Sequence, residues 1–222
     1  MDDLLKLAHA LSPYTICGEG NVSQKVQDEF QSCFYIKASG TSLDSLKREN
    51  LVACNLSGSP LDSTQKPSME VSFHAWIFDN FCDVNFIAHT HPTFTNKILC
   101  SESCHSFADQ RLFPDQVVRN GRKSCLVPYA TPGRELRDEI KKQIEYFIDD
   151  EGFFPKLILL ENHGIITTGS TYKDCLASSL MCEKSAEIFL GAKLLGKIQY
   201  LTEDQINAID KCPNEAYRRK VF

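Results

Sequence analysis

The chain has 222 residues, of which 42% are hydrophobic and 24% are charged, and its formal net charge is −5 at pH 7. This composition is typical of one α/β domain, which we expect to span residues 1–222, and the negative charge argues against a nucleic-acid partner. No apolar run reaches the length of a membrane span and the N-terminus lacks the features of a signal peptide, so we expect a cytoplasmic protein with no membrane contact.

The first half of the chain predicts short strands around one helix. Residues 34–39 and 50–56 favour strands, since each is a β-rich run bounded by turn-forming sequence. Residues 68–81 carry apolar side chains at positions 69, 73, 76 and 77, a spacing that predicts a helix. The apolar run at 84–90 predicts a further strand.

The second half predicts long helices around a strand pair. Residues 133–150 and 171–196 have the pattern of long amphipathic helices, and 202–212 begins with a threonine cap and an acidic first turn. Between them, residues 155–169 read as two strands joined by a turn at "ENHG". Strands and helices mixed along one chain predict helical layers packed on a central sheet.

The ten cysteines are scattered and include no C-x-x-C pair. In a chain of this length, that pattern favours reduced, packed thiols over a disulfide framework. Cys100, Cys104 and His105 lie close together in sequence, but their spacing does not match a structural zinc site and no second pair follows.

Two histidines lie in or directly after the predicted strand 84–90, and they raise the question whether the protein binds a metal ion. Residues i and i+2 of a strand face the same side, so His89 and His91 project together and two imidazoles can share one ion. Taken alone, each candidate has a simpler interpretation: half-buried structural histidines for this pair, a turn histidine for His163 and an acid at a helix start for Glu70. His74, one turn after Glu70, is expected to pack or hydrogen-bond within its own helix.

Six segments, taken in order, resemble the class II aldolase/adducin family, which is typified by fuculose-phosphate and rhamnulose-phosphate aldolases. The segments are "GEGNVS" (18–23), "IKASGTSLDSL" (36–46), "PSMEVSFHAWIF" (67–78), "IAHTHP" (87–92), "VPYATPGRELRDEI" (127–140) and "ENHGIITTG" (161–169). The resemblance implies a single domain of this family over residues 1–222. Its fold would be α/β, with three α/β/α layers and a central, largely antiparallel mixed sheet.

The resemblance also implies a Zn²⁺ site. His89, His91 and His163 correspond to the three metal-binding histidines of the family. Glu70 corresponds to the glutamate that completes the coordination and then serves as the catalytic acid/base. Three histidines and one carboxylate are a ligand set typical of zinc with an exchangeable position.

A substrate-phosphate site is implied beside the metal. The loop "GEGNVS" lacks the third glycine of a dinucleotide-binding loop, so we do not expect a nucleotide cofactor. The family's phosphate-binding groups correspond here to Gly20, Asn21, Ser39, Gly40 and Ser68, each of which is otherwise a turn or cap residue.

Two departures from the best-known aldolase concern the substrate. Met69 stands where the fuculose-phosphate enzyme has a second serine, so one hydroxyl donor is missing. Residues 105–120 contain no tyrosine, although related aldolases provide a tyrosine acid there from a neighbouring subunit. Tyr217, near the C-terminus, aligns only loosely with a tail tyrosine of relatives, which leaves the proton donor to the leaving aldehyde unassigned.

The function implied is reversible aldol cleavage of a small, fuculose-phosphate-like ketose phosphate by a zinc-dependent aldolase, through a metal-stabilised enediolate. Related members epimerise, dehydrate or decarboxylate sugar phosphates or sugar acids with a similar metal shell. An adducin-like structural module without catalysis is the alternative of another class. The three histidines and the lack of a long basic tail argue against that module. The resemblance further implies a homotetramer with active sites at subunit interfaces.

Overall fold

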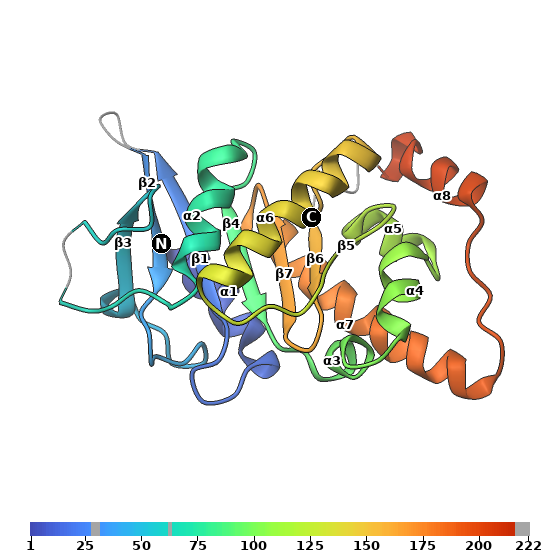
Figure 1. The fold of residues 1–222 in the computed structure, drawn as a ribbon, viewed down its shortest axis with the longest axis horizontal. Coiled ribbons are helices and arrows are strands. Elements are labelled where there is room, and N and C mark those ends of the chain that lie inside the picture. Colours follow the sequence, from blue (N-terminus) through green and yellow to red (C-terminus); the bar gives the residue numbers. More distant parts are fainter. Residues whose placement is uncertain (28–31, 62–63, 216–222) are drawn as a thin grey trace.

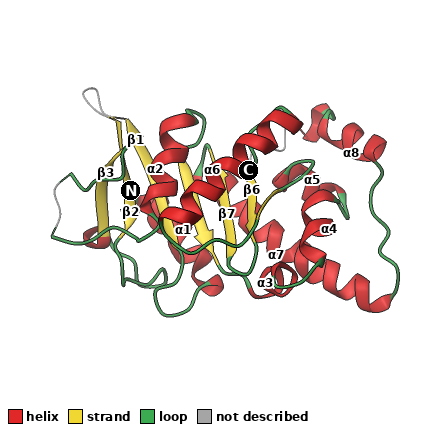
Figure 2. Cartoon of the chain, viewed as in Figure 1, coloured by secondary structure: helices red, strands yellow, loops and turns green. Residues whose placement is uncertain are grey.

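The computed structural model describes residues 1–27, 32–61 and 64–215. Over these residues, the strands form one sheet of seven in the order β3-β2-β1-β4-β7-β6-β5 (Figures 1 and 2). Neighbouring strands are antiparallel, except β5 and β6, which are parallel. The strands are β1 (Asn21–Gln27), β2 (Ser32–Lys37), β3 (Leu51–Asn55), β4 (Phe86–Thr90), β5 (Cys125–Val127), β6 (Leu157–Leu160) and β7 (Gly164–Gly169).

Helices cover both faces of this sheet, which confirms the predicted three-layer α/β/α fold with a largely antiparallel mixed sheet. In Figure 1, α2 and α6 lie in front of the strands and α7 lies behind them. The helices are α1 (Asp2–Leu11), α2 (Val71–Asn80), α3 (Thr93–Leu99), α4 (Ser103–Asp109), α5 (Pro114–Asn120), α6 (Arg134–Glu151), α7 (Tyr172–Leu195) and α8 (Glu203–Asp210), with 3₁₀ turns η1 (Ser12–Tyr14) and η2 (Arg48–Asn50).

The apolar residues of strand β4 explain why the central strands are covered on both sides. All five of its residues are buried, and successive side chains point to opposite faces. Ile87 packs in the cluster that α2 and α6 close, whereas Phe86 and Ala88 pack in the cluster that α1 closes. Helix α1 contributes there through Leu4, Leu7, Ala8 and Leu11, which follow helical spacing. The β-rich, largely apolar run at 84–90 therefore corresponds to a strand that is buried on both faces.

Most predicted elements are confirmed with small shifts at their ends. The strands expected at 34–39, 50–56 and 84–90 are β2, β3 and β4, and the two strands expected within 155–169 are β6 and β7. The helices expected at 133–150, 171–196 and 202–212 are α6, α7 and α8. Thr171 and Thr202 accept hydrogen bonds from backbone N–H groups as N-caps of the last two.

The helix expected at 68–81 begins later than predicted. Helix α2 starts at Val71, and Met69 lies before it with 78% of its surface exposed. The inclusion of position 69 in the helical apolar pattern was therefore wrong, because residues 67–70 form the approach to the helix. Strands β1 and β5 and helices α1, α3, α4 and α5 had not been predicted.

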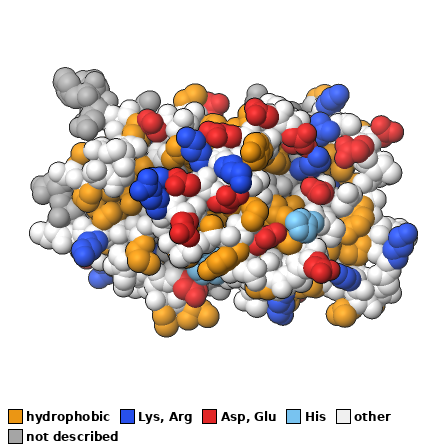
Figure 3. Space-filling view, in the orientation of Figure 1, with side chains coloured by type: hydrophobic (Ala, Val, Ile, Leu, Met, Phe, Trp, Pro, Cys, Tyr) orange, Lys and Arg blue, Asp and Glu red, His pale blue; other side chains and the backbone are white. Residues whose placement is uncertain are grey.

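The surface in Figure 3 carries charges of both signs. On the face that it shows, acidic and basic side chains are interspersed. Among the described residues, no helix combines the length and apolar character needed to cross a bilayer. All ten cysteines are free thiols.

Candidate metal centre

Three histidines from two neighbouring strands meet at one end of the sheet. His89 lies in β4, His91 follows one residue after that strand ends, and His163 lies in the turn that precedes β7. Because β4 and β7 pair with Thr90 opposite Ile165, the end of one strand adjoins the start of the other. The ring centroids of the three histidines are 4.8, 4.9 and 5.1 Å apart. One candidate ligand atom from each lies within 4.8 Å of the others.

Glu70 contributes a carboxylate at the same point from the start of helix α2, whereas the histidines lie at one end of the sheet. It is the N-cap residue of α2, and its side chain is largely buried. Its Oε2 atom lies 3.3 Å from His89 Nε2, and its Oε1 atom lies 3.6 Å from His163 Nε2. The structure thus brings together all four residues that the family resemblance assigned to the metal.

The hydrogen bonds of His89 fix which nitrogen faces the centre. Its Nδ1 lies 2.9 Å from the carbonyl oxygen of Ile165, which can only accept, so Nδ1 carries the proton. The unprotonated Nε2 then points at His91 Nε2, 3.0 Å away, and at Glu70. A backbone carbonyl that holds one ring nitrogen while the other faces an ion is the usual second-shell arrangement of a ligating histidine.

The electrostatics of the four side chains suit a cation. Burial lowers the pKa of His89, His91 and His163 to about 4, so the imidazoles are neutral at pH 7, the form that binds metals. Burial also raises the pKa of Glu70, against the opposing effects of His163 and Asn21. Within the described part of the chain, Glu70 Oε1 and His163 Nδ1 are buried and form no hydrogen bond. Three neutral imidazoles and a buried carboxylate oxygen without a hydrogen bond fit a divalent cation.

Two glycines permit the close backbone approach on which the centre depends. A Cβ atom on Gly20 would lie 2.5 Å from the carbonyl oxygen of His89, and Gly20 also has a φ of +63°. A Cβ atom on Gly164 would lie 2.5 Å from the carbonyl oxygen of Thr90 and 2.6 Å from the His91 ring. Any larger residue at either position would displace a metal-facing histidine or its strand.

A cavity of about 210 Å³ opens beside the centre. All five residues assigned to phosphate binding line it, together with Met69, Glu70, His91 and His163; the five are Gly20, Asn21, Ser39, Gly40 and Ser68. His89 lies beneath the cavity, fully buried. All the sequence-predicted site residues except His89 therefore line a single cavity.

Lys37 lines this cavity and was missed by the sequence analysis. Its side chain is buried, and its ammonium group donates to the carbonyl oxygens of Gly18, at 3.0 Å, and Thr41, at 2.6 Å. Among the described residues, no carboxylate lies within salt-bridge distance of it. Burial lowers the pKa of Lys37, while Glu70 acts in the opposite direction. Lys37 thus connects the loop that contains Gly18 with the loop that contains Gly40 through hydrogen bonds, and its ammonium group adds positive charge beside them. Its position at the end of β2, directly before "ASG", was the available sequence indication.

Glu19 was also missed as a partner of His91. Its Oε2 lies 3.6 Å from His91 Nδ1 and accepts a hydrogen bond of 3.0 Å from the backbone N–H of Ile16. A carboxylate behind one ring nitrogen directs the other nitrogen toward the metal position. Tyr217 lies outside the described residues.

A second group of possible ligands lies apart from the centre. Cys104, His105 and Glu161 offer candidate ligand atoms within 4.8 Å of one another, whereas Cys100 is not part of the group. The Cys104 thiol donates to Glu161 at 3.6 Å, and burial raises the pKa of this thiol. The protonated thiol with a carboxylate acceptor agrees with the expectation that these cysteines are packed thiols.

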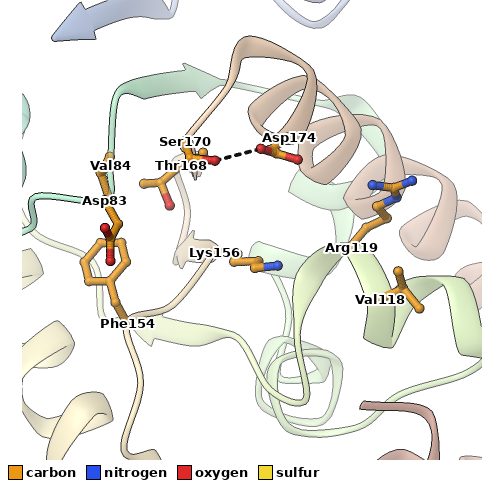
Figure 4. Close-up of a pocket in the computed structure, with 10 residues that line it drawn as sticks. Asp83, Val84, Val118, Arg119, Phe154, Lys156, Thr168, Ser170 and Asp174 are labelled. Carbon is orange, nitrogen blue, oxygen red and sulfur yellow. Dashed lines mark hydrogen bonds between the residues drawn. The ribbon is translucent and has the colours of Figure 1, made fainter. Parts of the chain in front are cut away.

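A larger cavity, of about 330 Å³, lies at the other end of strands β4 and β7 (Figure 4). Its lining includes Lys156, Arg119, Asp83 and Asp174, and the Asp174 carboxylate accepts a hydrogen bond from Ser170. None of the sequence-predicted site residues lines it. The smaller cavity is therefore the one that combines convergent polar groups with the metal-type cluster.

Several known proteins resemble this chain in sequence or in fold. The chain is 29% identical to a 3-oxo-tetronate 4-phosphate decarboxylase of Haemophilus influenzae, over 89% of this chain and 88% of the relative. It is 28% identical to a 5-deoxy-D-ribulose 1-phosphate aldolase of Bacillus thuringiensis serovar kurstaki, over 86% and 84%. Its fold matches that of an L-fuculose 1-phosphate aldolase structure with a TM-score of 0.78 and 20% identity, over 95% of this chain and 93% of that one.

A family model extends this likeness over most of the chain. The model of the class II aldolase and adducin N-terminal domain matches residues 6–190. This range runs from α1 to the later turns of α7, so it includes every residue of the metal centre and of the cavity beside it. The chain therefore belongs to the class II aldolase and adducin family.

Proposed function

We propose that the protein is a metal-dependent carbon–carbon lyase that acts on a small phosphorylated sugar derivative. One observation supports this proposal: three neutral histidines and Glu70 lie together beside a cavity that the glycine-containing loops at 18–20 and 39–40 also line. A purely structural module has no need for such a cluster, whose orphaned carboxylate oxygen is costly to bury. The arrangement therefore favours an enzyme over an adducin-like module.

Each part of the site has a separate task. His89, His91, His163 and Glu70 would hold a Zn²⁺ ion, which when bound supplies electrophilic stabilisation of negative charge on a substrate oxygen. The N–H and hydroxyl groups around Gly20, Ser39, Gly40 and Ser68 would orient the phosphate, and the buried ammonium of Lys37 would favour its charge.

Glu70 would transfer the proton at the reacting carbon. Burial raises the pKa of its carboxyl group, which brings the proton-carrying form closer to neutral pH. Its Oε1 is buried and accepts no hydrogen bond from the described residues, so this oxygen has unused accepting capacity beside His163. The other oxygen is held by Asn21 at 2.9 Å.

Decarboxylation of a 3-oxo sugar-acid phosphate is the reaction that we place first. The bond between the carboxylate carbon and C2 breaks, carbon dioxide leaves, and the electron pair moves onto the C3 carbonyl oxygen. C2 then accepts one proton from Glu70, which gives dihydroxyacetone phosphate from a four-carbon substrate. No hydroxyl proton has to be removed, which suits a chain without a tyrosine in residues 105–120. The likeness to the Haemophilus decarboxylase supports this choice.

Aldol cleavage of a ketose 1-phosphate is the second candidate. The bond between C3 and C4 breaks, and the C4 hydroxyl must give up its proton as the aldehyde leaves, so a base beyond Glu70 is required. C3 is then protonated to give the same product, dihydroxyacetone phosphate. The likeness to the Bacillus aldolase supports this alternative.

A direct assay separates the two reactions. Zinc-loaded protein is incubated with 3-oxo-tetronate 4-phosphate or with 5-deoxyribulose 1-phosphate, and dihydroxyacetone phosphate and carbon dioxide are measured. We expect faster product formation from the oxo acid, with one carbon dioxide per product, and loss of activity in protein stripped by a chelator. Faster cleavage of the ketose phosphate would reverse the order, and no product from either would refute the proposed function.

Position 69 allows a test of phosphate recognition. We expect Met69→Ser to raise the preference of kcat/KM for phosphorylated over unphosphorylated substrate by roughly tenfold, because a hydroxyl group adds one hydrogen bond to a charged ligand. Met69 lines the cavity, and its side chain is exposed enough for replacement without a packing defect. Met69→Ala is the control, since it removes the methionine and adds no donor. Equal preferences in the serine and alanine variants would show that the phosphate does not approach this position.

We also propose a homotetramer with active sites at subunit interfaces. Three large apolar side chains are strongly exposed in the single chain: Met69 (78%), which lines the cavity, and Ile16 (71%) and Tyr129 (60%), each within three residues in sequence of a residue that lines it. Exposed apolar surface beside a site is typical of a face that another subunit covers. Light scattering on zinc-loaded protein at micromolar concentration is expected to give four times the 25.1 kDa chain mass. A monomer that retains full turnover would contradict this assembly.

A further inference from the structure

His74 lies behind the site in an unusually specific environment. Its side chain is completely buried between α2 and β1. Its Nδ1 lies 2.6 Å from Ser23 Oγ, and its Nε2 lies 2.5 Å from Asn21 Oδ1. The Phe73 ring stacks on the imidazole at a centroid distance of 4.3 Å. His74 was expected to pack or hydrogen-bond within its own helix: it does pack on Phe73 of that helix, but both of its hydrogen-bond partners lie on β1.

The chemistry of these partners fixes the proton positions. The amide oxygen of Asn21 can only accept, so His74 Nε2 carries a proton and donates it. Burial lowers the pKa of His74 well below its usual range, so the ring is neutral and Nδ1 has a free lone pair. The Ser23 hydroxyl therefore donates to Nδ1, and only one tautomer satisfies both contacts.

The same contacts select one orientation of the Asn21 amide. With its oxygen toward His74, its NH₂ group donates to Glu70 Oε2 at 2.9 Å and to Ser68 Oγ at 3.1 Å. A flipped amide would place its oxygen against the Glu70 carboxylate and its NH₂ group against a protonated ring nitrogen. His74 and the Glu70 carboxylate therefore favour the same orientation of the Asn21 amide.

Glu70 depends on this bond for its alignment. The carboxylate oxygen that Asn21 holds is the one 3.3 Å from His89 Nε2, and the other oxygen lies 3.6 Å from His163 Nε2. Rotation of the carboxylate would move both oxygens out of these positions among the histidines. Errors of about 1 Å in the position of a reacting group can cost about a hundredfold in rate.

We propose that His74 is a positioning residue of the lyase: it holds the Asn21 amide in one orientation and, through it, aligns the Glu70 carboxylate for proton transfer. This role rests on the function proposed above, because it concerns the proton that Glu70 transfers. His74 itself does not line the cavity and does not touch the substrate.

The test compares three variants as zinc-loaded proteins. His74→Leu removes both contacts, and we expect kcat to fall roughly tenfold to a hundredfold, with KM and zinc content near those of the wild type. His74→Gln keeps an N–H donor near the position of Nε2 and should recover most of kcat. Ser23→Ala removes only the hydroxyl group that donates to Nδ1 and helps hold the ring in place, and it should lower kcat severalfold, which keeps the test valid if the leucine variant does not fold. Ser179→Ala, which removes a buried hydroxyl bonded to Thr167 on another part of the sheet, is the control with unchanged kcat.

A readout without substrate separates this inference from the proposed function. In protein labelled with ¹⁵N-histidine, NMR should show His74 protonated at Nε2 and unprotonated at Nδ1. Protonation at Nδ1, or full kcat in a folded His74→Leu variant, would overturn the positioning role. A wild type that converts none of the substrates would instead count against the proposed function, and the tautomer alone would then decide whether His74 orients Asn21.

Discussion

His91→Ala is expected to lower the zinc bound per chain sharply and to abolish turnover. His91 Nε2 lies 3.0 Å from the unprotonated Nε2 of His89, so its removal takes away one of the three nitrogen donors. Loss of a ligand should weaken binding by more than the roughly tenfold to hundredfold that loss of an outer-shell partner costs. Elemental analysis after dialysis against a weak chelator measures the effect. His91 is preferable to His89 because it is only partly buried, so alanine leaves a smaller packing defect.

The control for this experiment is His105→Ala. His105 is an exposed histidine in the second ligand group, away from the cavity, and its loss should leave zinc content and turnover unchanged. Thermal unfolding of both variants establishes that they are folded. One zinc per chain retained in folded His91→Ala, at wild-type affinity, would show that the metal is bound elsewhere.

Glu70→Gln is expected to lower kcat by a factor on the order of a hundred to ten thousand, the usual contribution of a general acid or base. Glutamine preserves the size of the side chain, and its carbonyl oxygen can still accept the hydrogen bond from Asn21. It cannot carry the proton that the reacting carbon needs. Three histidines should still hold zinc, with a somewhat lower affinity, so the loss should appear in kcat far more than in metal content.

The matched control for Glu70 is Glu161→Gln. Glu161 is a partly buried carboxylate in the turn that carries His163, but it does not line the cavity beside the metal centre. Its replacement should leave kcat unchanged. A Glu70→Gln variant that retains near-normal kcat with zinc bound would reduce Glu70 to a metal ligand or a helix-start acid.

The apolar patterns of the sequence predicted the elements that bury apolar side chains. Strand β4 was evident from a β-rich, largely apolar run, and α6 and α7 from their amphipathic spacing. Strand β1 was missed because its residues Asn21, Ser23 and Lys25 are polar. Their side chains are satisfied by Glu70, by His74 and by the carbonyl oxygen of Phe78, respectively, so hydrogen bonds stabilise that face of the strand in place of apolar burial.

Short helices were missed for a different reason. Helices α3, α4 and α5 have seven residues each, which is too short to display a clear period. Much of their stabilisation comes from distant contacts that no local pattern contains. Glu183 of α7, for example, accepts hydrogen bonds from the backbone N–H groups of Phe94 and Thr95 at the start of α3.

The site residues also differ in whether local sequence alone could predict their positions. The shared direction of His89 and His91 followed from strand geometry, and the rings do lie together. The place of His163 depends on the pairing of β4 with β7, and that of Glu70 on the packing of α2 against the sheet, so both needed the family resemblance. The role of His74 could not be inferred because its partners lie on the strand that had not been predicted.

The proposed lyase function requires that the metal centre and Glu70 act together on a substrate carbon next to a carbonyl group. Both candidate reactions yield dihydroxyacetone phosphate, so this product tests the claim whichever reaction is correct. Dihydroxyacetone phosphate in D₂O is incubated with zinc-loaded wild type, with chelator-stripped protein and with Glu70→Gln, and deuterium at the hydroxymethyl carbon away from the phosphate is followed by NMR. We expect exchange of one hydrogen by the zinc-loaded wild type and almost none by the other two. Equal exchange in all three samples, or none with zinc-loaded wild type, would contradict it.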